Sequence, residues 1–388
     1  MRQNKPFVAI ICARNPGNAG MYSVDLAALD FFSRLDCDFD FLTSHTPQRM
    51  GRRTLNKFFG IDVGHKNHFR FGKIKFYKFS GVAQLSKYSH IVYWGDFINN
   101  PAYGRDDFSR TDLNNNMSKD IESAFARWQK LYNLSEGKPS GRVISVGNNF
   151  QYPTERFNAE DKAIFKNMEK NFDMIFPRDY ISFENLLTMF SSESVNKVHL
   201  GMDAAFLLTY TEIPTKENIF CYHFRRSRFG SSIKLVNEIE SITKLKGISL
   251  GNWTNLSKDH ADTTFWKYLR LISASQFVIT DLYHVAINAI RQNIPVFGIG
   301  NISNAQVTTL SDFKKDILFK TFDLHNYYIK IGIEEAREDK GIDDILSVIT
   351  KLFPLDQNTL NQIFKEKNRK IIDFKRQLTE CFEINSKL

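Results

Sequence analysis

The sequence of 388 residues contains few cysteines and no long apolar run. Its four cysteines lie far apart, without a CxxC pair or a short Cys/His spacing, and they are Cys12, Cys37, Cys221 and Cys381. This spacing argues against a zinc site and against a disulfide framework. No apolar stretch approaches the roughly 20 residues that span a bilayer. We therefore expect neither a disulfide-rich module nor a transmembrane protein, and no metal site.

The common nucleotide-binding and nucleic-acid-binding signatures are also missing. Neither GxGxxG nor GxxxxGK[ST] occurs, so a dinucleotide site of that type or a P-loop is not expected. The densest basic cluster is FRRSRF at 224–229, which is too short for a nucleic-acid arm. The net charge is nevertheless +9. Such a balance favours an anionic partner, but a solvated basic surface is the simpler interpretation of most of the excess. Of the anionic partners we expect a small-molecule donor and no nucleic acid.

The amino terminus, MRQNKPFVAIICARNPG, has a basic start followed by only about six apolar residues. It lacks a small-residue cleavage pattern, so it predicts a first strand and a cytoplasmic, reducing environment. The basic balance and an amphipathic final helix would suit peripheral docking at the inner face of the cell membrane. An ordinary solvated helix face is the simpler interpretation. The sequence makes no prediction of the oligomeric state.

Short apolar runs alternate with helical patterns along most of the chain, which is typical of βαβ units and a parallel sheet. Helical patterns include 17–35, 117–134, 231–245, 262–275 and a segment from about His284. The expected strands are 7–13, 37–44, 89–97, 141–150, 171–179, 196–208, 219–225, 247–253, 276–281 and 294–300.

The apolar pattern breaks at TYTEIPTKEN, residues 209–218, which predicts a linker. The predicted fold class is therefore α/β, with two Rossmann-like, doubly wound domains facing a cleft. We place the domains at 1–210 and 218–340. Residues 341–388 are expected to form C-terminal helices, including one long helix, that pack back on the body.

Ligands of open α/β sheets bind beyond the carboxyl ends of the strands, so polar residues there are site candidates. Asp96 in WGDFINN can accept hydrogen bonds from sugar hydroxyls or act as a general base. Alternatively, it caps the next turn. Turn residues before the first helix can hold a phosphate or a hydroxyl group, or form a plain tight turn. Candidates for binding a polar acceptor are Asn15, Asn18, Gly20, Asn148 and Asn149.

The second half places a cluster of cations after its first strand, in CYHFRRSRFG. Strand alternation predicts His223 and Arg225 on one face. Guanidinium groups bind carboxylate and phosphate through two parallel hydrogen bonds, which suits a small anionic donor. The candidates for donor binding are His223, Arg225, Arg226 and Arg228.

The stretch ITDLYHVAINAIRQNIPVFGIG places His284 in the first turn of a helix that follows a buried strand. An imidazole there can act as acid or base at cellular pH. A lone histidine is more often structural, but the strand-end position and the nearby arginines favour a catalytic role. Asp281 is a candidate catalytic residue or helix cap, and Tyr283 a further donor-binding candidate.

These motifs, taken in order, resemble the polysaccharide pyruvyl transferase family. Its Asp-Arg-Leu-His segment with a following "G-I/V-P-V" strand is similar to TDLYHVAINAIRQNIPVFGIG. FPRDYISFENL at 176–186 and MDAAFLL at 202–208 are similar to its Arg-Asp-x-x-Ser and Asp-Pro-Ala-Phe-Leu-Leu segments. FRRS at 224–227 falls where the family has a donor-binding arginine. SHIVYWGDFINN lies where the family has a Gly-Gly segment.

The resemblance implies a fold like that of the two-domain GT-B glycosyltransferases, with an acceptor side in 1–210 and a donor side in 218–340. It implies transfer of a pyruvyl group from phosphoenolpyruvate, as a ketal, to a sugar of a surface glycan or its lipid-linked precursor, without a cofactor. His284 would protonate the methylene carbon of the donor, and Arg225 or Arg226 would hold its carboxylate or phosphate.

Two positions depart from the family pattern. Leu282 stands where the family has arginine, and the early Gly-Asp is Gly20-Met21. Losing an arginine removes a charge-assisted contact to the donor. Two alternatives are therefore kept: a glycosyltransferase that uses an activated sugar, and a glycan- or anion-binding protein without catalysis.

Overall fold

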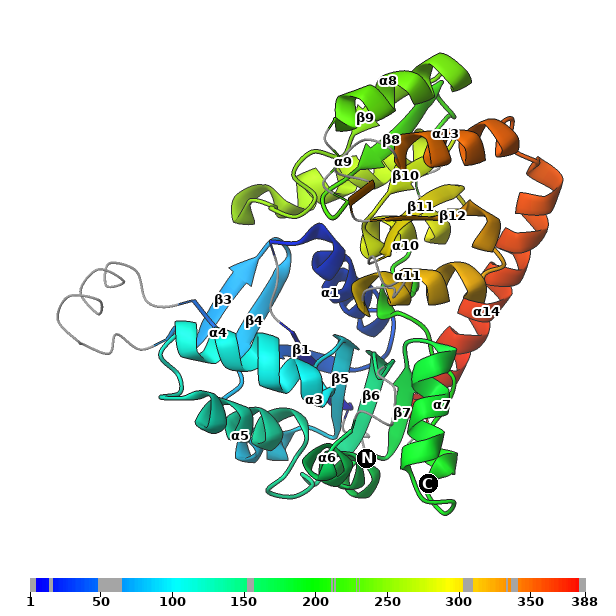
Figure 1. The fold of residues 1–388 in the computed structure, drawn as a ribbon. Coiled ribbons are helices and arrows are strands. Elements are labelled where there is room, and N and C mark those ends of the chain that lie inside the picture. Colours follow the sequence, from blue (N-terminus) through cyan, green and yellow to red (C-terminus); the bar gives the residue numbers. More distant parts are fainter. Residues whose placement is uncertain are drawn as a thin grey trace. The chain divides into compact units, whose positions relative to one another are not determined.

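The computed structural model describes residues 5–13, 17–47, 65–151, 157–302 (except 211, 213, 228 and 230), 310–332, 334–335 and 341–383. Its internal contacts divide the chain into two compact units. Unit 1 comprises Met1–Pro16 and Ser23–Leu208, and unit 2 comprises Gly17–Tyr22 and Thr209–Leu388. Each unit has its own sheet flanked by helices (Figure 1), so the predicted α/β class is confirmed.

The sheet of unit 1 has seven strands in the order β3-β4-β2-β1-β5-β6-β7. All neighbours are parallel except β3 and β4. The central strands β1 and β5 are almost entirely buried, because helices cover both faces of a parallel sheet. The strands are β1 (Phe7–Cys12), β2 (Asp38–Thr43), β3 (His68–Phe71), β4 (Ile74–Lys78), β5 (His90–Asp96), β6 (Arg142–Asn148) and β7 (Met174–Pro177).

Two neighbouring aromatic residues of β5 identify the helices on each face. Tyr93 donates its hydroxyl to the carbonyl oxygen of Leu131 in α5, whereas Trp94 donates its indole N–H to that of Val24 in α1. Consecutive strand residues point to opposite faces, so α1 and α5 lie on opposite sides of the sheet. The helices of unit 1 are α1 (Ala19–Phe32), α3 (Pro101–Tyr103), α4 (Ser109–Asn114), α5 (Ile121–Tyr132), α6 (Ala159–Asn171) and α7 (Tyr180–Met189).

The structure differs from the predicted elements of unit 1 in two places. The hairpin β3–β4, which turns at Gly72 (φ 51°), is not among the predicted strands. The predicted strand at 196–208 is wrong, since only Val198 forms an isolated bridge there. Asp203 instead accepts the backbone N–H of Ala205 and starts a buried 3-10 turn. A short buried apolar run does not by itself distinguish these two conformations.

The sheet of unit 2 has five parallel strands in the order β12-β11-β10-β8-β9. Four of them coincide with predicted strands to within a few residues, and β12 is an addition. The strands are β8 (Ile219–His223), β9 (Lys246–Ser249), β10 (Val278–Thr280), β11 (Val296–Ile302) and β12 (Tyr328–Gly332).

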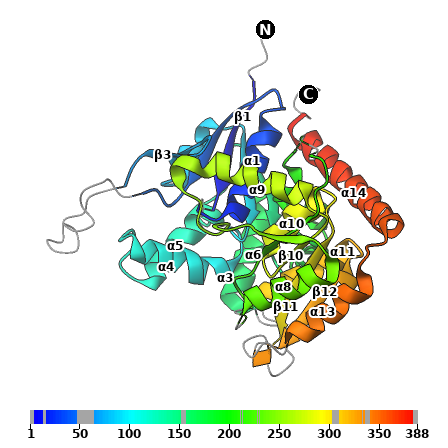
Figure 2. The ribbon, with the colours of Figure 1, turned by 90° about the horizontal axis from the view of Figure 1, so that it is seen from above.

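The predicted long C-terminal helix is confirmed as α14, whose first half lies beside α11 (Figures 1 and 2). Lys370 of α14 donates to the carbonyl oxygen of Thr321 at the end of α11. Within the described ranges, no helix combines the length and apolar character needed to cross a bilayer. The helices of unit 2 are α8 (Ser232–Thr243), α9 (Ala261–Ala274), α10 (Tyr283–Arg291), α11 (Leu310–Thr321), α13 (Gly341–Leu352) and α14 (Gln357–Glu383).

Both sheets change winding direction at one strand. In unit 1, β2 lies on one side of β1 and β5 lies on the other. In unit 2, β9 and β10 lie on opposite sides of β8. Ligands of such sheets bind at the carboxyl ends of the strands that flank this switch point. In unit 1 these strand ends are Cys12 of β1 and Asp96 of β5. In unit 2 they are His223 of β8 and Asp281, which directly follows β10.

Candidate functional site

Asp96 is the last residue of β5 and has a left-handed backbone, with φ of 56°. The preceding Gly95 has φ of 77°, and a Cβ there would lie 2.4 Å from a methyl carbon of Val24. A non-glycine residue with positive φ costs free energy and is over-represented at functional sites. The backbone N–H of Asn149 donates to the carbonyl oxygen of Asp96 at 2.7 Å and fixes this strand end.

Arg178 follows β7 and is surrounded by carboxylates. Its side chain is fully buried, with Nη1 3.9 Å from an oxygen of Asp96 and 3.9 Å from one of Asp203, and Nε 3.7 Å from Asp179. The guanidinium also lies over the ring of Phe97 at 5.1 Å. A buried cation needs such partners. We call Asp96, Arg178, Asp179 and Asp203 the Arg178 cluster.

A second buried carboxyl lies close to Asp96. Burial, together with the negative charge of Asp96, raises the pKa of Asp25 to about 8, although the Cys12 thiol hydrogen-bonded to it acts in the opposite direction. Asp25 is 2% exposed and lies on α1, above the end of β1. The switch point of unit 1 therefore holds a carboxyl group, that of Asp25, which is protonated at neutral pH.

The two adjacent asparagines at the end of β6 differ in what their side chains do. Asn148 is fully buried; its amide donates to Tyr93 and Ser145 and accepts the N–H of Asn99, so in this geometry it supports the strand ends. Asn149 is equally buried, and its Oδ1 accepts the N–H of Gln151. Within the described ranges its Nδ2 has no hydrogen-bond partner.

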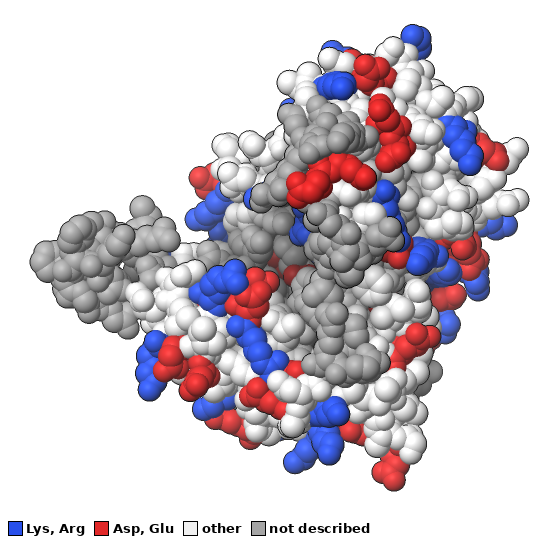
Figure 3. All heavy atoms as spheres, viewed as in Figure 1, with Lys and Arg blue, Asp and Glu red and all other residues white. Residues whose placement is uncertain are grey.

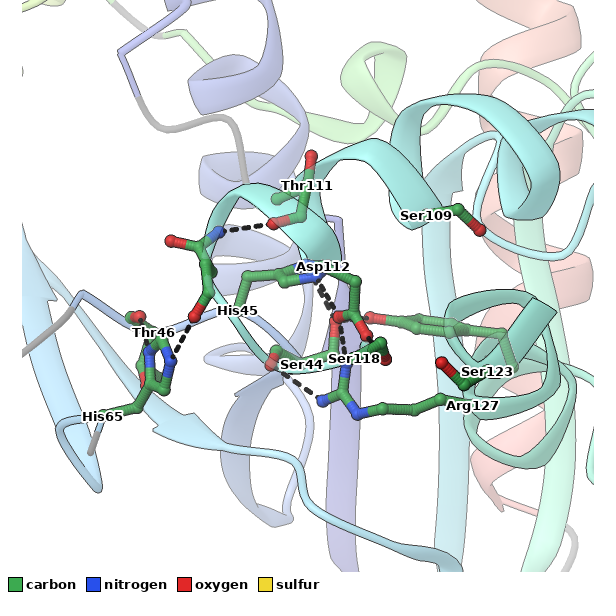
Figure 4. Close-up of polar contacts among 12 residues, drawn as sticks. Ser44, His45, Thr46, His65, Ser109, Thr111, Asp112, Ser118, Ser123 and Arg127 are labelled. Carbon is green, nitrogen blue, oxygen red and sulfur yellow. Dashed lines mark hydrogen bonds and ion pairs between the residues drawn. The ribbon is translucent and has the colours of Figure 1, made fainter. Parts of the chain in front are cut away.

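A buried polar network in unit 1 contains the residue types of a nucleophilic triad, and sequence reasoning did not identify it (Figure 4). His45 Nε2 lies 2.8 Å from Asp112, and its Nδ1 lies 3.1 Å from Ser44. Arg127 and Ser118 also bind the Asp112 carboxylate. Ser44 is 1% and His45 3% exposed, so a substrate could not reach the hydroxyl. The network fastens the end of β2 to α4 and α5.

In unit 2, Asp281 organises the loop that follows β8. Its carboxylate is fully buried and accepts the backbone N–H groups of Arg225 (2.9 Å), Arg226 (2.6 Å) and Ser227 (2.7 Å). A carboxylate that accepts several backbone N–H groups holds a loop firmly. Asp281 therefore positions residues 225–227, and its side chain faces the protein interior.

Polar side chains without hydrogen-bond partners surround this loop. His223 is 8% and Ser227 3% exposed. Within the part of the chain described here, neither His223 Nε2 nor Ser227 Oγ has a partner. Burial lowers the pKa of His223 and outweighs the opposing charge of Asp281, so this imidazole is neutral at physiological pH. Unpaired buried polar atoms are costly and point to a ligand or water at this position.

The arginines themselves extend away from this interior. Arg225 and Arg226 are exposed, whereas His223 is buried. The prediction that alternation places residues 223 and 225 on one face is therefore wrong, because β8 ends at His223. The predicted site residues Arg228 and Asn15 lie outside the described residues.

A buried lysine that sequence reasoning missed connects the strand ends of unit 2. Lys315 of α11 is 1% exposed, forms an ion pair with Asp312, and donates to the carbonyl oxygens of Asp281 and Ile299. Burial lowers its pKa, and the charge of Asp312 opposes this. No local pattern signals such a residue, because its partners follow β10 and lie in β11.

His284 lies in the first turn of α10 and is half-buried. Its ring stands 5.2 Å from that of the buried Tyr283, which Lys314 covers at 4.9 Å. Gly20 lies against it: a Cβ on Gly20 would be 2.4 Å from the Cβ of His284. Asn18 accepts the N–H of Gly20 and thereby caps α1. The structure thus brings Gly20 and His284 together within unit 2.

Charged side chains of both signs are interspersed on the face shown in Figure 3. Among the described residues, no three His, Cys, Asp or Glu side chains are grouped closely enough to hold a metal ion.

Comparison with known proteins identifies one family. Residues 125–304, just under half of the chain, match the family model described as polysaccharide pyruvyl transferase. The matched range contains Arg178, Asp203, the 224–227 loop, Asp281 and His284. No curated protein matches the chain.

Several solved structures are similar over most of their length at low identity. A functionally uncharacterised protein, KP1_0663 from Klebsiella pneumoniae, has 16% identity and a TM-score of 0.42, with 84% of this chain and 92% of that chain covered. The UDP-GlcNAc 2-epimerase from Methanocaldococcus jannaschii has 12% identity and a TM-score of 0.43, with 88% and 92% covered. Anabaena Alr3699/HepE, in complex with UDP, has 9% identity and a TM-score of 0.42, with 97% and 99% covered.

The site motifs quoted from the sequence and the matched family model therefore agree. The predicted resemblance to the polysaccharide pyruvyl transferase family is confirmed by the match over residues 125–304, and this match indicates an enzyme of the transferase class.

Proposed function

We propose that this transferase moves the pyruvyl group of phosphoenolpyruvate onto a sugar of a cell-surface glycan, or of its lipid-linked precursor, in the cytoplasm. Donation of a proton to the methylene carbon of the donor makes the adjacent carbon electrophilic. One sugar hydroxyl adds there and phosphate leaves; a second hydroxyl then closes the cyclic ketal. No cofactor or metal takes part in this proposal.

The observation that carries the proposal is the arrangement at the switch point of unit 2. Asp281 binds the backbone of the 225–227 loop, and three residues later His284 begins α10. A phosphorylated carboxylate needs cations at fixed positions together with a proton donor. In this proposal His284 is the proton donor, while Arg225 and Arg226 bind the anionic groups.

The other predicted residues take supporting roles in the proposal. His223, neutral through burial, and Ser227 offer unpaired polar atoms to the donor. Tyr283 packs against His284 and orients its ring. Asp96, with the Arg178 cluster, would bind or activate the acceptor hydroxyl in unit 1. In the described part of unit 1, the Nδ2 group of Asn149 has no hydrogen-bond partner and could bind the ligand, whereas that of Asn148 donates to Ser145.

One observation favours a second candidate, a glycosyltransferase that uses a nucleotide sugar. Leu282, half-buried and apolar, occupies the position where the family resemblance leads us to expect arginine. Without that guanidinium, the site has one fewer group for a small trianionic donor. The missing arginine would weaken the binding of a nucleotide sugar less, because the other contacts of that ligand are distributed over its base, ribose and sugar.

Titration of the full chain separates these two donors. We expect phosphoenolpyruvate to raise the melting temperature saturably and nucleotide sugars to leave it unchanged, because a ligand stabilises only the protein that binds it. Stabilisation by nucleotide sugars alone would establish the second candidate. Binding of phosphoenolpyruvate without turnover on any glycan acceptor would indicate a binding protein instead.

His284→Ala tests the proton donor. We expect turnover to fall by roughly 10²–10⁴-fold, the usual contribution of a general acid, while the melting temperature stays close to that of the wild type. His260→Ala, at an exposed position of the same unit, is the matched control and should keep full activity. Equal activity of the two variants would remove His284 from the mechanism.

A further inference from the structure

A groove in unit 2 lies beside α14, at the edge of the sheet opposite the proposed transfer site. Lys216, Gln276 and Pro295 line it, and each stands one to three residues before the start of a strand, β8, β10 and β11 respectively. His223 is the last residue of β8, and Asp281 directly follows β10. Strands of a parallel sheet begin at one edge and end at the other. The groove is therefore separate from the His284 site.

The other wall of the groove is α14, which a buried lysine holds in place. Lys367 is fully buried, and its Nζ donates to the carbonyl oxygens of Ile290 and Arg291 at 3.1 Å and to Oδ1 of Asn293 at 2.6 Å. Asn293 itself lines the groove. The wall is thus anchored to the end of α10. The cavity volume is about 840 Å³, within the roughly 300–1,000 Å³ of small-molecule sites.

Carboxamide side chains dominate the lining. An amide both donates and accepts hydrogen bonds, as a sugar hydroxyl does. Gln357, Asn361, Lys365 and Asn368 follow one another at intervals of three or four residues along α14, so they share one face of the helix. The amide-bearing residues of the groove are Gln276, Asn293, Gln357, Asn361, Gln362 and Asn368.

The charges in the groove favour an anion. Among the described residues that line it, the three cations Lys216, Lys365 and Arg369 outnumber the one carboxylate, Glu366. Arg369 is paired with Glu366 through two hydrogen bonds of 2.9 and 2.5 Å. No carboxylate of the described lining pairs with the two lysines, and Lys216, whose pKa burial lowers to about 8, is still mostly protonated at neutral pH. Such a lining complements a negatively charged ligand.

The apolar lining does not suit a nucleotide or a protein partner. Phe364, the aromatic residue of the groove, is 6% exposed, so no ring face is available for stacking a base. Of the aliphatic groups, Pro295 is buried and only Ile372 is well exposed, at 66%. A stable protein interface needs a larger apolar core.

We propose that this groove, lined by amides and two uncompensated lysines, is a second glycan site that binds an acidic oligosaccharide. The ligand's hydroxyl groups bond to the amides, and its carboxylate lies between Lys216 and Lys365. The inference depends on this lining alone and holds whichever donor the His284 site uses.

Calorimetric titration of the full chain with a uronic-acid-containing hexasaccharide tests the proposal. We expect saturable binding, much weaker binding of neutral maltohexaose, and none of inorganic phosphate. Lys365→Glu, and Asn361→Ala combined with Asn368→Ala, should each weaken binding at least about tenfold. Lys365 and Asn361 are exposed and Asn368 is half-buried, so the variants should fold.

Two controls separate this site from the rest of the molecule. Lys375→Glu changes the same charge on α14 outside the groove, and His284→Ala disables the proposed transfer site; both should bind within twofold of the wild type. Absence of saturable binding, equal weakening by a control, or full competition by phosphate would overturn the proposal. So would a Lys365→Glu variant that changes only the oligomeric state, since the groove would then join two copies of the chain.

Discussion

Single residues determine where His284 stands. Gly20 touches it so closely that a methyl group would collide with the imidazole, while a methyl group on Gly17, in the same turn, would meet nothing within 4 Å. Both glycines belong to unit 2 through the segment Gly17–Tyr22. The absence of a side chain at position 20 is therefore a condition for the placement of His284.

We expect Gly20→Ala to displace the His284 ring and to lower kcat at least about tenfold, because small misplacements of a reacting group are costly. Gly17→Ala should leave activity unchanged. A shifted imidazole resonance of His284 in the NMR spectrum of histidine-labelled Gly20→Ala protein would show the displacement without any assay of transfer. An unmoved resonance with full activity would contradict this role for Gly20.

Asp25 is expected to make stability depend on pH. Its pKa is raised to about 8 in the folded chain, from 3.8 when unfolded, so between these values the folded state retains a proton that the unfolded state releases. The free energy of unfolding should therefore fall as pH rises from about 4 to about 8.

Asp25→Asn should flatten this dependence, by up to ~1.4 kcal/mol for each pH unit. Urea denaturation at pH 5 and at pH 7.5 measures it. Asp30→Asn, on the same helix, is the control. If the curves of wild type and Asp25→Asn run parallel, Asp25 is ionised in the folded protein.

At the scale of elements, α10 is held at both ends. Its first turn carries His284 against Gly20, and its last carbonyl groups, those of Ile290 and Arg291, receive the ammonium group of Lys367 from α14. Burial, together with the charge of Arg291, lowers the pKa of Lys367 to about 7. The group donates to carbonyl oxygens that have no partner within the helix, and its charged form also interacts favourably with the helix dipole. The C-terminal helix thereby supports the helix that carries the proposed catalytic residue.

Lys367→Met should lower the free energy of unfolding by about 1–3 kcal/mol, because it leaves buried carbonyl oxygens without a donor. Lys375→Met, a change of the same kind at a half-buried position of α14, should cost less than about 0.5 kcal/mol. Urea denaturation followed by circular dichroism compares them. Equal stability of both variants would mean that water replaces the ammonium group at no cost.

At the scale of the whole molecule, the two units are joined by a helix that both use. The first residues of α1 belong to unit 2, where Ala19 donates its N–H to the carbonyl oxygen of Trp253 and Tyr22 donates its hydroxyl to Asp262. The remainder of α1, from Ser23, belongs to unit 1. Loss of a contact in this first segment should therefore weaken unit 2 selectively.

Tyr22→Phe removes one such contact and is expected to cost about 0.5–1.5 kcal/mol. In hydrogen exchange measured by mass spectrometry, peptides from α9 should lose protection, while peptides from β1 and β5 should keep it. Uniform loss of protection in both units would contradict the assignment of Gly17–Tyr22 to unit 2.

Several features follow from local sequence alone. Apolar runs such as 90–94 and 278–280 predict buried strands, and the helical spacing at 357–382 predicts α14. The position of His284, after a strand and at the start of a helix, is equally local. The 3-10 turn at Ala204–Leu207, where Asp203 accepts the backbone N–H of Ala205, escapes this reasoning because a short buried apolar run does not distinguish such a turn from a strand.

The sequence by itself determined the α/β class, the alternation of strands and helices, and the family motifs, since periodicity and residue order encode these. Only the tertiary structure decided what each polar residue binds. Arg178 meets Asp96 and Asp203, and Lys315 meets Asp281, across long sequence distances. Burial requires such partners for charged groups, but which strand ends supply them depends on the winding of the sheet.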